Sequence, residues 1–125
     1  MKHIYFSILT VFLLLFFTGC SYRSDSGITP PSPEIYVKPA IKITTSPMEH
    51  KNCKTIDSIH AVVKKLTLGH TNPTRNQVDY ILAEKGKKIG ANVVRNTHYN
   101  SGIGFTTWGY IEAFGDASKC DLKNK

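Results

Sequence analysis

Three cysteines and five histidines are the side chains with the widest range of chemistry in this 125-residue chain. A thiol can carry a lipid, form a disulfide, or bind zinc together with imidazole nitrogens. His50 and Cys53 have a spacing typical of metal ligands. Further candidate ligands are His60, His70 and His98. A structural zinc site needs four ligands, usually with clustered thiolates, and only Cys53 lies nearby in the sequence. We therefore expect exposed or hydrogen-bonded histidines and no metal site.

Catalytic motifs are the next class of chemistry to consider. Asp57 and His60 would share a face for acid–base work only on a helix, because their odd spacing separates them on a strand. The sequence contains no nucleophile elbow, paired-carboxylate motif or phosphate-binding loop. We expect a protein that is not an enzyme, with no catalytic residues and no cofactor.

The N-terminus has the order of features found in export signals. Met1-Lys2-His3 is basic, and the apolar run Ile4–Phe17 follows it. An uncleaved anchor is the alternative, but this run is shorter than the roughly 20 residues that span a bilayer. Leu13–Cys20 resembles the lipobox of bacterial lipoprotein signals. The resemblance implies removal of a signal peptide at residues 1–19, lipidation of Cys20, and export.

Lipidation would also set the location and the partners of the protein. A diacylglyceryl cysteine carries two chains, and two chains anchor a protein stably in a membrane. Ser21 follows Cys20, whereas an aspartate there commonly retains lipoproteins in the inner membrane. We therefore expect an outer-membrane lipoprotein that faces the periplasm and meets no nucleic acid. The whole chain has a net charge of +7, and loss of Lys2 with the signal peptide would leave about +6. This charge either keeps the domain soluble or attracts it to anionic headgroups or wall polymers.

A proline-rich segment comes after the cysteine. Thr29-Pro30-Pro31-Ser32-Pro33 favours polyproline II without hydrogen-bonded structure. Twenty such residues reach at most ~60 Å at about 3.1 Å each. We interpret residues 20–47 as the lipidated cysteine and a linker, with at most an edge strand near Ile41–Thr45. Residues 48–125 then form one small domain.

Periodicity predicts the elements of this domain. Thr55–Val63 is rich in β-branched residues, which favours a strand over the alternative helix. Thr74 and Gln77 fit a capping box, and a helix with Val78, Ile81, Leu82 and Ile89 on one stripe should run to Gly90. We explain Gly86 inside that helix by close packing on a sheet.

Two further strands complete the expected fold. Asn92–Tyr99 reads as a strand, Asn100–Gly104 as a turn, and Trp108–Phe114 as a second strand continuing loosely to Cys120. The helical crossover makes the first two strands parallel, and the hairpin makes the third antiparallel to both. We predict an α+β domain of β-α-β-β order, with one helix packed on a mixed sheet of three to four strands.

Once lipidation takes Cys20, Cys53 and Cys120 are an even pair in an oxidising compartment, where a disulfide is the default. If the third strand lies beside the first, the start of the first strand meets the end of the third. These two ends carry Cys53 and Cys120, so strand order and cysteine placement agree.

The segment Lys88–Val94, with its Gly-Ala-Asn, resembles a group of small envelope lipoproteins that includes the stress-sensor lipoprotein RcsF. The shared pattern has a cysteine opening a strand, a helix ending in Gly-Ala-Asn, an apolar strand, and a last strand ending in Ala-x-x-Cys. Here these are Cys53, Ile89–Asn92, Val93-Val94 and Ala117–Cys120. The resemblance implies this fold and the disulfide, and does not carry over a signalling role. RcsF has two disulfides in its domain, whereas only one can form here.

Aromatic residues gather on the last strand. The alternating residues on one of its faces are Trp108, Tyr110, Glu112 and Phe114. We expect the helix on the other face, toward which Ile111 and Ala113 point. The aromatic face is then either core under the linker strand or an open patch that binds a protein or ligand.

These observations predict a non-catalytic, lipid-anchored envelope protein that acts as an interaction, sensor or structural module. Its expected partners are the membrane, through the N-terminal lipid, and an envelope protein or cell-wall component. The alternative is a periplasmic domain that binds a small ligand or a metal.

Overall fold

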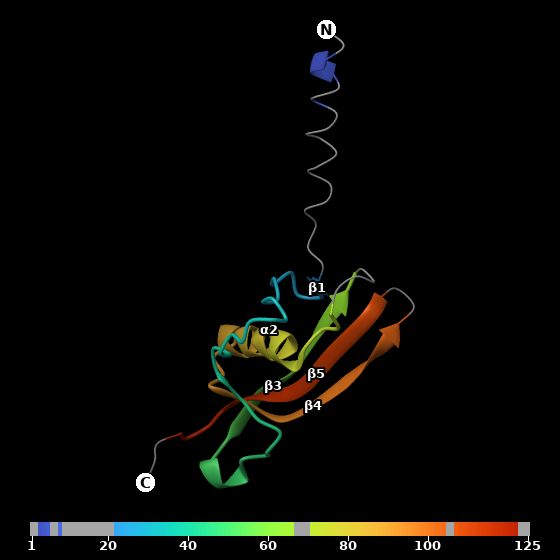
Figure 1. Cartoon of the computed structure of the whole chain (residues 1–125). Coiled ribbons are helices and arrows are strands. Elements are labelled where there is room, and N and C mark those ends of the chain that lie inside the picture. The colour runs from blue at the N-terminus through green and yellow to red at the C-terminus, as the bar shows by residue number, and fades with distance from the viewer. Residues whose placement is uncertain (1–2, 6–7, 9–21, 67–70, 105–106, 123–125) are drawn as a thin grey trace.

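The computed structural model describes residues 3–5, 8, 22–66, 71–104 and 107–122, without the side chains of residues 50, 104 and 107. Figure 1 shows a strongly twisted sheet with α2 lying across one of its faces. The elements are β1 (Tyr22–Ser24), β2 (Lys42–Ile43), the 3₁₀ helix η1 (Glu49–Lys51), β3 (Lys54–Lys65), α2 (Arg75–Lys88), β4 (Val93–Gly104) and β5 (Thr107–Lys119).

The sheet has the strand order β1-β3-β5-β4-β2. The central strand β5 is antiparallel to both β3 and β4, as predicted, and β2 pairs parallel with β4. The α+β class and the mixed sheet are therefore confirmed. The predicted count of three to four strands is too low, because two short edge strands bring the described sheet to five.

Alternating burial explains why β3 is a strand. Ala61 and Val63 are fully buried, and Ile59 packs beside them against the same core. A helix over this segment, the alternative considered from the sequence, is wrong. The period of two places one face of β3 under α2 and the other toward solvent.

The helix begins and ends as its sequence indicates. The Thr74 hydroxyl accepts from the Gln77 N–H at 3.3 Å, and the Gln77 side chain accepts from the Thr74 N–H at 2.8 Å. A Cβ at Gly86 would lie 2.8 Å from a methyl group of Ile41, which confirms close packing. Gly90 ends the helix with φ +90°. Ile89 is an exception to the predicted stripe, because it is the C-cap residue and is 42% exposed.

Residues 22–47 differ from the extended spacer expected of them. Strands β1 and β2 belong to the sheet, so its border does not coincide with the predicted domain boundary at residue 48. Asn76 of α2 forms two hydrogen bonds with the backbone of Val37, and the Gln77 amide donates to the Pro31 carbonyl. The polar first turn of α2 thus holds the proline-rich segment against the domain. Of the structure in residues 22–47, the sequence predicted only the short edge strand at Lys42–Ile43.

The predicted turn at Asn100–Gly104 is also wrong. β4 continues through Gly104, which pairs with Thr107, and residues 105 and 106 between them lie outside the described residues. Gly102 remains in the strand because the ring of its cross-strand partner Tyr110 lies over it, 3.4 Å from the place of a Cβ. An aromatic neighbour of this kind compensates for a glycine in a strand.

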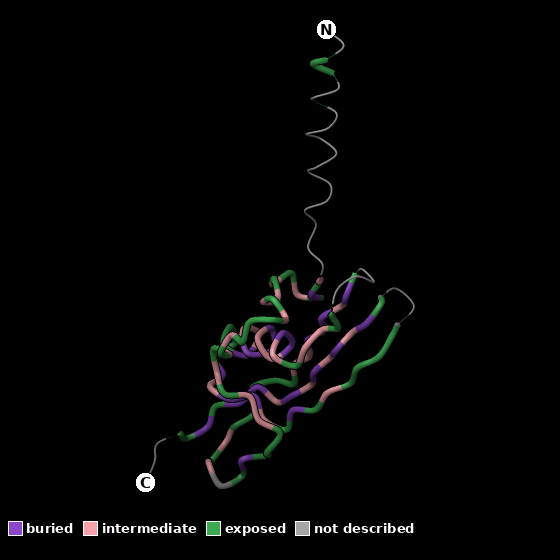
Figure 2. Tube along the Cα trace, in the orientation of Figure 1, coloured by how far each residue is buried: buried purple, intermediate pink, exposed green. Residues whose placement is uncertain are grey.

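The register defines two ends of the sheet. At the N-proximal end, Tyr22 pairs with Lys65 and Arg23 with Lys64. At the disulfide end, Lys54 pairs with Lys119. Figure 2 shows buried residues concentrated between the sheet and α2. The two described clusters of buried apolar residues, with their partly buried neighbours, draw on residues 22–120 alone.

Candidate functional site

The aromatic residues of β5 lie on the face that α2 does not cover. Ile111 and Ala113 are buried in the core beneath the helix, as expected. Tyr110, Glu112 and Phe114 alternate with them, and Trp108 is 51% exposed. We call this side of the sheet the open face. It consists of Trp108, Tyr110, Glu112 and Phe114 with their cross-strand neighbours on β3 and β4.

A ladder of three rings crosses the middle of the open face. Phe114 is the cross-strand partner of both His60 and His98. Its ring centroid lies 4.3 Å from His60 and 5.1 Å from His98, with interplanar angles of 22° and 12°. These separations match the spacing of neighbouring strands, so the rings stand upright and stack side by side. Both faces of Phe114 are thereby covered, and ring edges point away from the sheet.

Glu112 connects this ladder to the next row of the sheet. Because an ionised carboxylate only accepts hydrogen bonds, His60 donates from Nε2 to Glu112 Oε2 at 3.0 Å. The Asn100 amide donates to the other oxygen at 3.3 Å. Asp57 pairs with Ala117 and does not share a face with His60, as expected of a strand. The imidazole–carboxylate pair could move a proton.

A shallow depression of about 490 Å³ lies beside Phe114. Its lining residues are Ser58, Ile59, His60, Asn96, His98, Phe114, Gly115 and Asp116. The Ser58 hydroxyl and the Asn96 amide donate to the two carboxylate oxygens of Asp116, at 3.1 and 2.9 Å. These bonds fix the polar wall of the depression. They also engage the Ser58 hydroxyl, which is the group that a nucleophilic mechanism beside His60 would need.

Sequence reasoning missed the polar residues Ser58, Asn96 and Asp116 of this face. Asn96 has φ +53° at a β-bulge between Arg95 and His98. A bulge changes the direction of a side chain, and one sequence does not reveal where a bulge falls. Ser58 and Asp116 are cross-strand partners, and their pairing became visible only with the register of β3 and β5.

The histidines do not form a metal centre within the described residues. No group of three or more His, Cys, Asp or Glu side chains is arranged there to hold a metal ion. The side chain of His50 and the whole of His70 lie outside what the structure describes, as does the predicted lipidation site Cys20. Among the described helices, none is long and apolar enough to cross a membrane.

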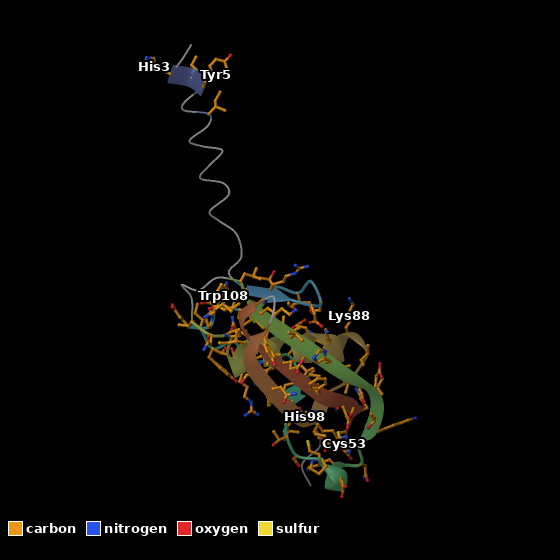
Figure 3. The ribbon with its side chains drawn as sticks, turned by 90° about the vertical axis from the view of Figure 1, so that its right-hand side faces the viewer. His3, Tyr5, Cys53, Lys88, His98 and Trp108 are labelled. Carbon is orange, nitrogen blue, oxygen red and sulfur yellow. A yellow bond between two sulfur atoms is a disulfide. The ribbon has the colours of Figure 1, made fainter. Side chains whose placement is uncertain are left out.

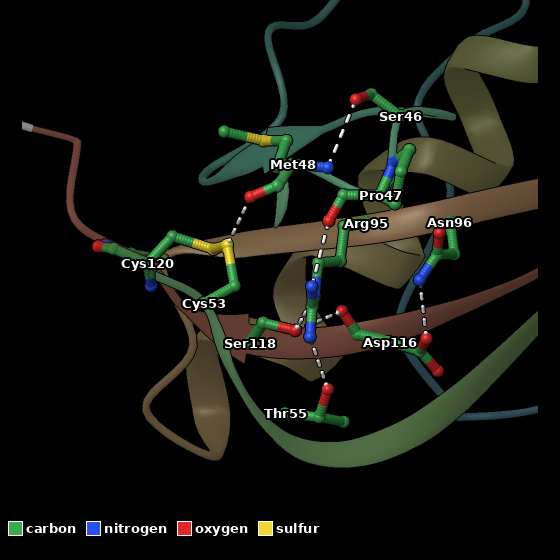
Figure 4. Close-up of a disulfide and its surroundings, with 11 residues drawn as sticks. Ser46, Pro47, Met48, Cys53, Thr55, Arg95, Asn96, Asp116, Ser118 and Cys120 are labelled. Carbon is green, nitrogen blue, oxygen red and sulfur yellow. Dashed lines mark hydrogen bonds between the residues drawn. A yellow bond between two sulfur atoms is a disulfide. The ribbon is translucent and has the colours of Figure 1, made fainter. Parts of the chain in front are cut away.

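The predicted bond between Cys53 and Cys120 is present (Figure 4). Beside it, the Asn92 side chain pairs with the backbone of Cys120, donating to the carbonyl and accepting from the N–H, both at 2.8 Å. Arg95 donates to the Ser118 hydroxyl at 3.0 Å. The same guanidinium donates to the Pro47 carbonyl at 2.9 Å and the Thr55 hydroxyl at 2.8 Å. The Asn of Gly-Ala-Asn therefore positions one of the two bonded cysteines.

A second polar cluster joins α2 to β4 on the covered side of the sheet. The Tyr99 hydroxyl donates to Asp79 at 2.5 Å, and the Arg75 guanidinium lies 4.1 Å from the centre of the Tyr99 ring. Burial raises the pKa of Tyr99 to about 12, and the hydrogen bond to Asp79 is the second largest cause. Burial also raises the pKa of Asp79, against the lowering effects of Tyr99 and Arg75. We assign this cluster to packing of α2 on the sheet, because α2 and β4 supply all of its members.

No protein family, curated protein or solved structure matches the chain. The resemblance to RcsF-like lipoproteins therefore stays a prediction from the sequence.

Proposed function

We propose that this protein is a non-catalytic, lipid-anchored module of the bacterial envelope that binds another protein through its open face. The observation that carries the proposal is the asymmetry of the sheet. One face is buried under α2, whereas on the other Tyr110, Glu112 and Phe114 are only partly buried and Trp108 is exposed. A row of this kind at the surface is typical of an interaction site.

The ring ladder favours a protein partner over a polysaccharide. Sugars pack on open aromatic faces, and both faces of Phe114 are covered by His60 and His98. Ring edges, the Asn100 amide and the Glu112 carboxylate suit the mixed polar and apolar surface of a folded protein. Together with the lipobox-like Leu13–Cys20, this supports an interaction, sensor or structural role.

A test of the anchor uses Cys20→Ser and the wild-type chain in bacterial cells. We expect the wild type in the membrane fraction, with the intact mass of a chain that starts at Cys20 and carries lipid. Cys20→Ser should keep its leader and lack the lipid. A wild-type chain found in the cytosol with all 125 residues and reduced thiols would contradict the proposed anchor.

A test of the open face uses a photo-crosslinking side chain at Asn100, with the same group at Lys88 on the far side of α2 as the control. We expect one recurring envelope protein crosslinked at position 100 and not at position 88. His98→Glu should weaken that crosslink at equal protein level, and the purified partner should bind the wild-type domain directly. Equal crosslinking from both positions, or none from position 100, would contradict the proposal.

A small polar ligand is the second candidate, because the depression beside Phe114 has a fixed carboxylate wall at Asp116. Such a ligand should protect His98 from chemical modification without any protein partner. Asp116→Asn should remove the protection if the depression is the site.

A further inference from the structure

We propose that the N-proximal end of the sheet rests on the bilayer surface and binds the headgroups of anionic phospholipids. This inference rests on the proposed lipid anchor at Cys20. It concerns β1 and the N-proximal end of the open face, where Trp108 and Lys64 lie, and not the ring ladder in the middle of β5.

The short tether is the first step of the argument. Strand β1 begins at Tyr22, two residues after Cys20. Two residues span at most ~7 Å when fully extended. Tyr22 is held in place, because it pairs with Lys65 and its hydroxyl donates to the Thr71 carbonyl at 2.7 Å. A lipid on Cys20 would therefore bring this end of the sheet to the headgroup layer, in place of the long spacer expected from the sequence.

The charges at this end suit an anionic surface. Arg23 and Lys64 are cross-strand partners and line a depression of about 320 Å³ together with Ser24 and Leu66. Asp25 also lines it, but its carboxylate accepts from the Val62 N–H at 3.2 Å and from Lys85 at 3.3 Å. Two cations held side by side can bind phosphate groups of a lipid surface.

Exposed apolar side chains accompany these cations. Trp108 is 51%, Leu66 42% and Ile103 81% exposed. Figure 3 places Trp108 at the same end of the sheet as β1 and far from Cys53. A tryptophan next to aliphatic and basic side chains is the composition that anchors proteins at membrane interfaces. The depression and the exposed indole thus lie at the end from which the chain would leave the membrane.

The disulfide end supplies a matched control. Lys54 and Lys119 are also cross-strand partners, and both are exposed. Reversing either cation pair changes the net charge equally. Attraction that depends only on the total charge would therefore respond alike to both double variants, whereas docking by one end would not.

The experiment uses residues 21–125, which carry all the described core clusters and lack both the leader and Cys20. Trp108 is the only tryptophan in the chain, so its fluorescence reports on this end alone. Vesicles of phosphatidylcholine with added phosphatidylglycerol should shift its emission to the blue, and brominated lipids should quench it. Vesicles of phosphatidylcholine alone should have little effect, and high salt should reverse the shift.

Two double variants locate the contact. Arg23→Glu with Lys64→Glu should weaken vesicle binding tenfold or more, since each basic residue near an anionic surface contributes about 1 kcal/mol. Lys54→Glu with Lys119→Glu should reduce it less than threefold. Equal losses from both would overturn the proposal. So would an unshifted, unquenched tryptophan in the wild type, a result that needs no variant to fold.

The outcome is independent of the anchor test. Vesicle binding by residues 21–125 needs no lipid on the protein, so a negative result leaves the Cys20→Ser experiment unaffected. Conversely, a wild-type chain that carries no lipid in cells would contradict the proposed anchor. The vesicle measurement would still show whether the N-proximal end binds anionic headgroups.

Discussion

The two ends of the sheet are held by different means. At the disulfide end, a covalent bond, the Asn92 pair and two bonds from Arg95 join β3, β4 and β5, and a third bond from Arg95 holds Pro47. At the N-proximal end, β1 is fixed by three register pairs and by its tyrosine hydroxyl, and the Lys65 ammonium donates to Asn72 at 3.0 Å. One end thus secures the fold, which leaves the other able to present Trp108 and two cations to solvent.

Breaking the disulfide should have the largest effect on this difference. Cys53 and Cys120 are 67 residues apart, and a loop of that length corresponds to about 4 kcal/mol in the chain-entropy model. We expect Cys53→Ala with Cys120→Ala to lower the melting temperature by at least ~15 °C for a domain of this size. Thermal unfolding followed by circular dichroism measures the change.

Reductant provides the control for that double variant. It should destabilise the wild type by a similar amount and leave the variant unchanged. An unaltered melting temperature in both conditions would mean that hydrogen bonds alone secure this end.

Removing the side chain of Asn92 should have the next largest effect. Asn92→Ala deletes two hydrogen bonds and leaves the N–H and C=O of Cys120 without these partners, which costs about 2 kcal/mol. Urea denaturation with the disulfide intact gives the value. Asn100→Ala is the control, because among the described residues that exposed amide bonds only to Glu112, at 3.3 Å, and its loss should change stability by less than about 0.5 kcal/mol. Equal losses for the two variants would show that the Asn92 pair has no special role.

Local patterns predicted the parts of the molecule in which neighbouring residues decide the structure. The Thr74 and Gln77 capping box needs only one turn of chain, and the alternation of Ala61 and Val63 needs only one strand. The disulfide was predicted from the even pair of cysteines left after lipidation, and the strand order agreed with it, because β-α-β-β connectivity brings Cys53 to Cys120 once β5 lies beside β3. The capping box and the alternation depend on contacts that each segment would make in almost any packing, whereas the disulfide depends on the order of the strands.

The rest depended on partners distant in sequence. Nothing within Pro31–Val37 shows that Asn76 and Gln77 will bind its carbonyl groups, so the segment looked like a free linker. Gly102 looked like part of a turn, because the ring that covers it belongs to Tyr110 on the next strand. Asn96 and Asp116 met only through the bulge in β4. The candidate site was therefore foreseen along β5 and missed on the strands to either side.

The smallest expected effect depends on pH and concerns neither end, but the cluster that joins α2 to β4 in the middle of the sheet. Tyr99 and Asp79 join α2 to β4 through the hydrogen bond that the tyrosine hydroxyl donates, whereas the disulfide end depends on a covalent bond. The pKa of Tyr99 is about 12 in the folded protein and about 10 in the unfolded chain, so the unfolded chain loses this proton at lower pH. The contribution of this hydrogen-bonded tyrosine to the free energy of unfolding is fully present below pH 10 and is lost as the pH rises toward 12.

Tyr99→Phe should therefore flatten the alkaline limb of the stability curve. Because solvent screens this half-buried group, the difference in the free energy of unfolding between wild type and variant should be about 1 kcal/mol. In an absorbance titration, Tyr99→Phe should lose the tyrosine with the raised pKa, whereas Tyr36→Phe, at a 75% exposed position, should retain it. Carboxyl NMR should show the pKa of Asp79 rising further in Tyr99→Phe, since the lost hydrogen bond had lowered it. If Asp79 instead titrated at lower pH in that variant, the hydroxyl would not be its donor, and packing alone would hold α2 against β4.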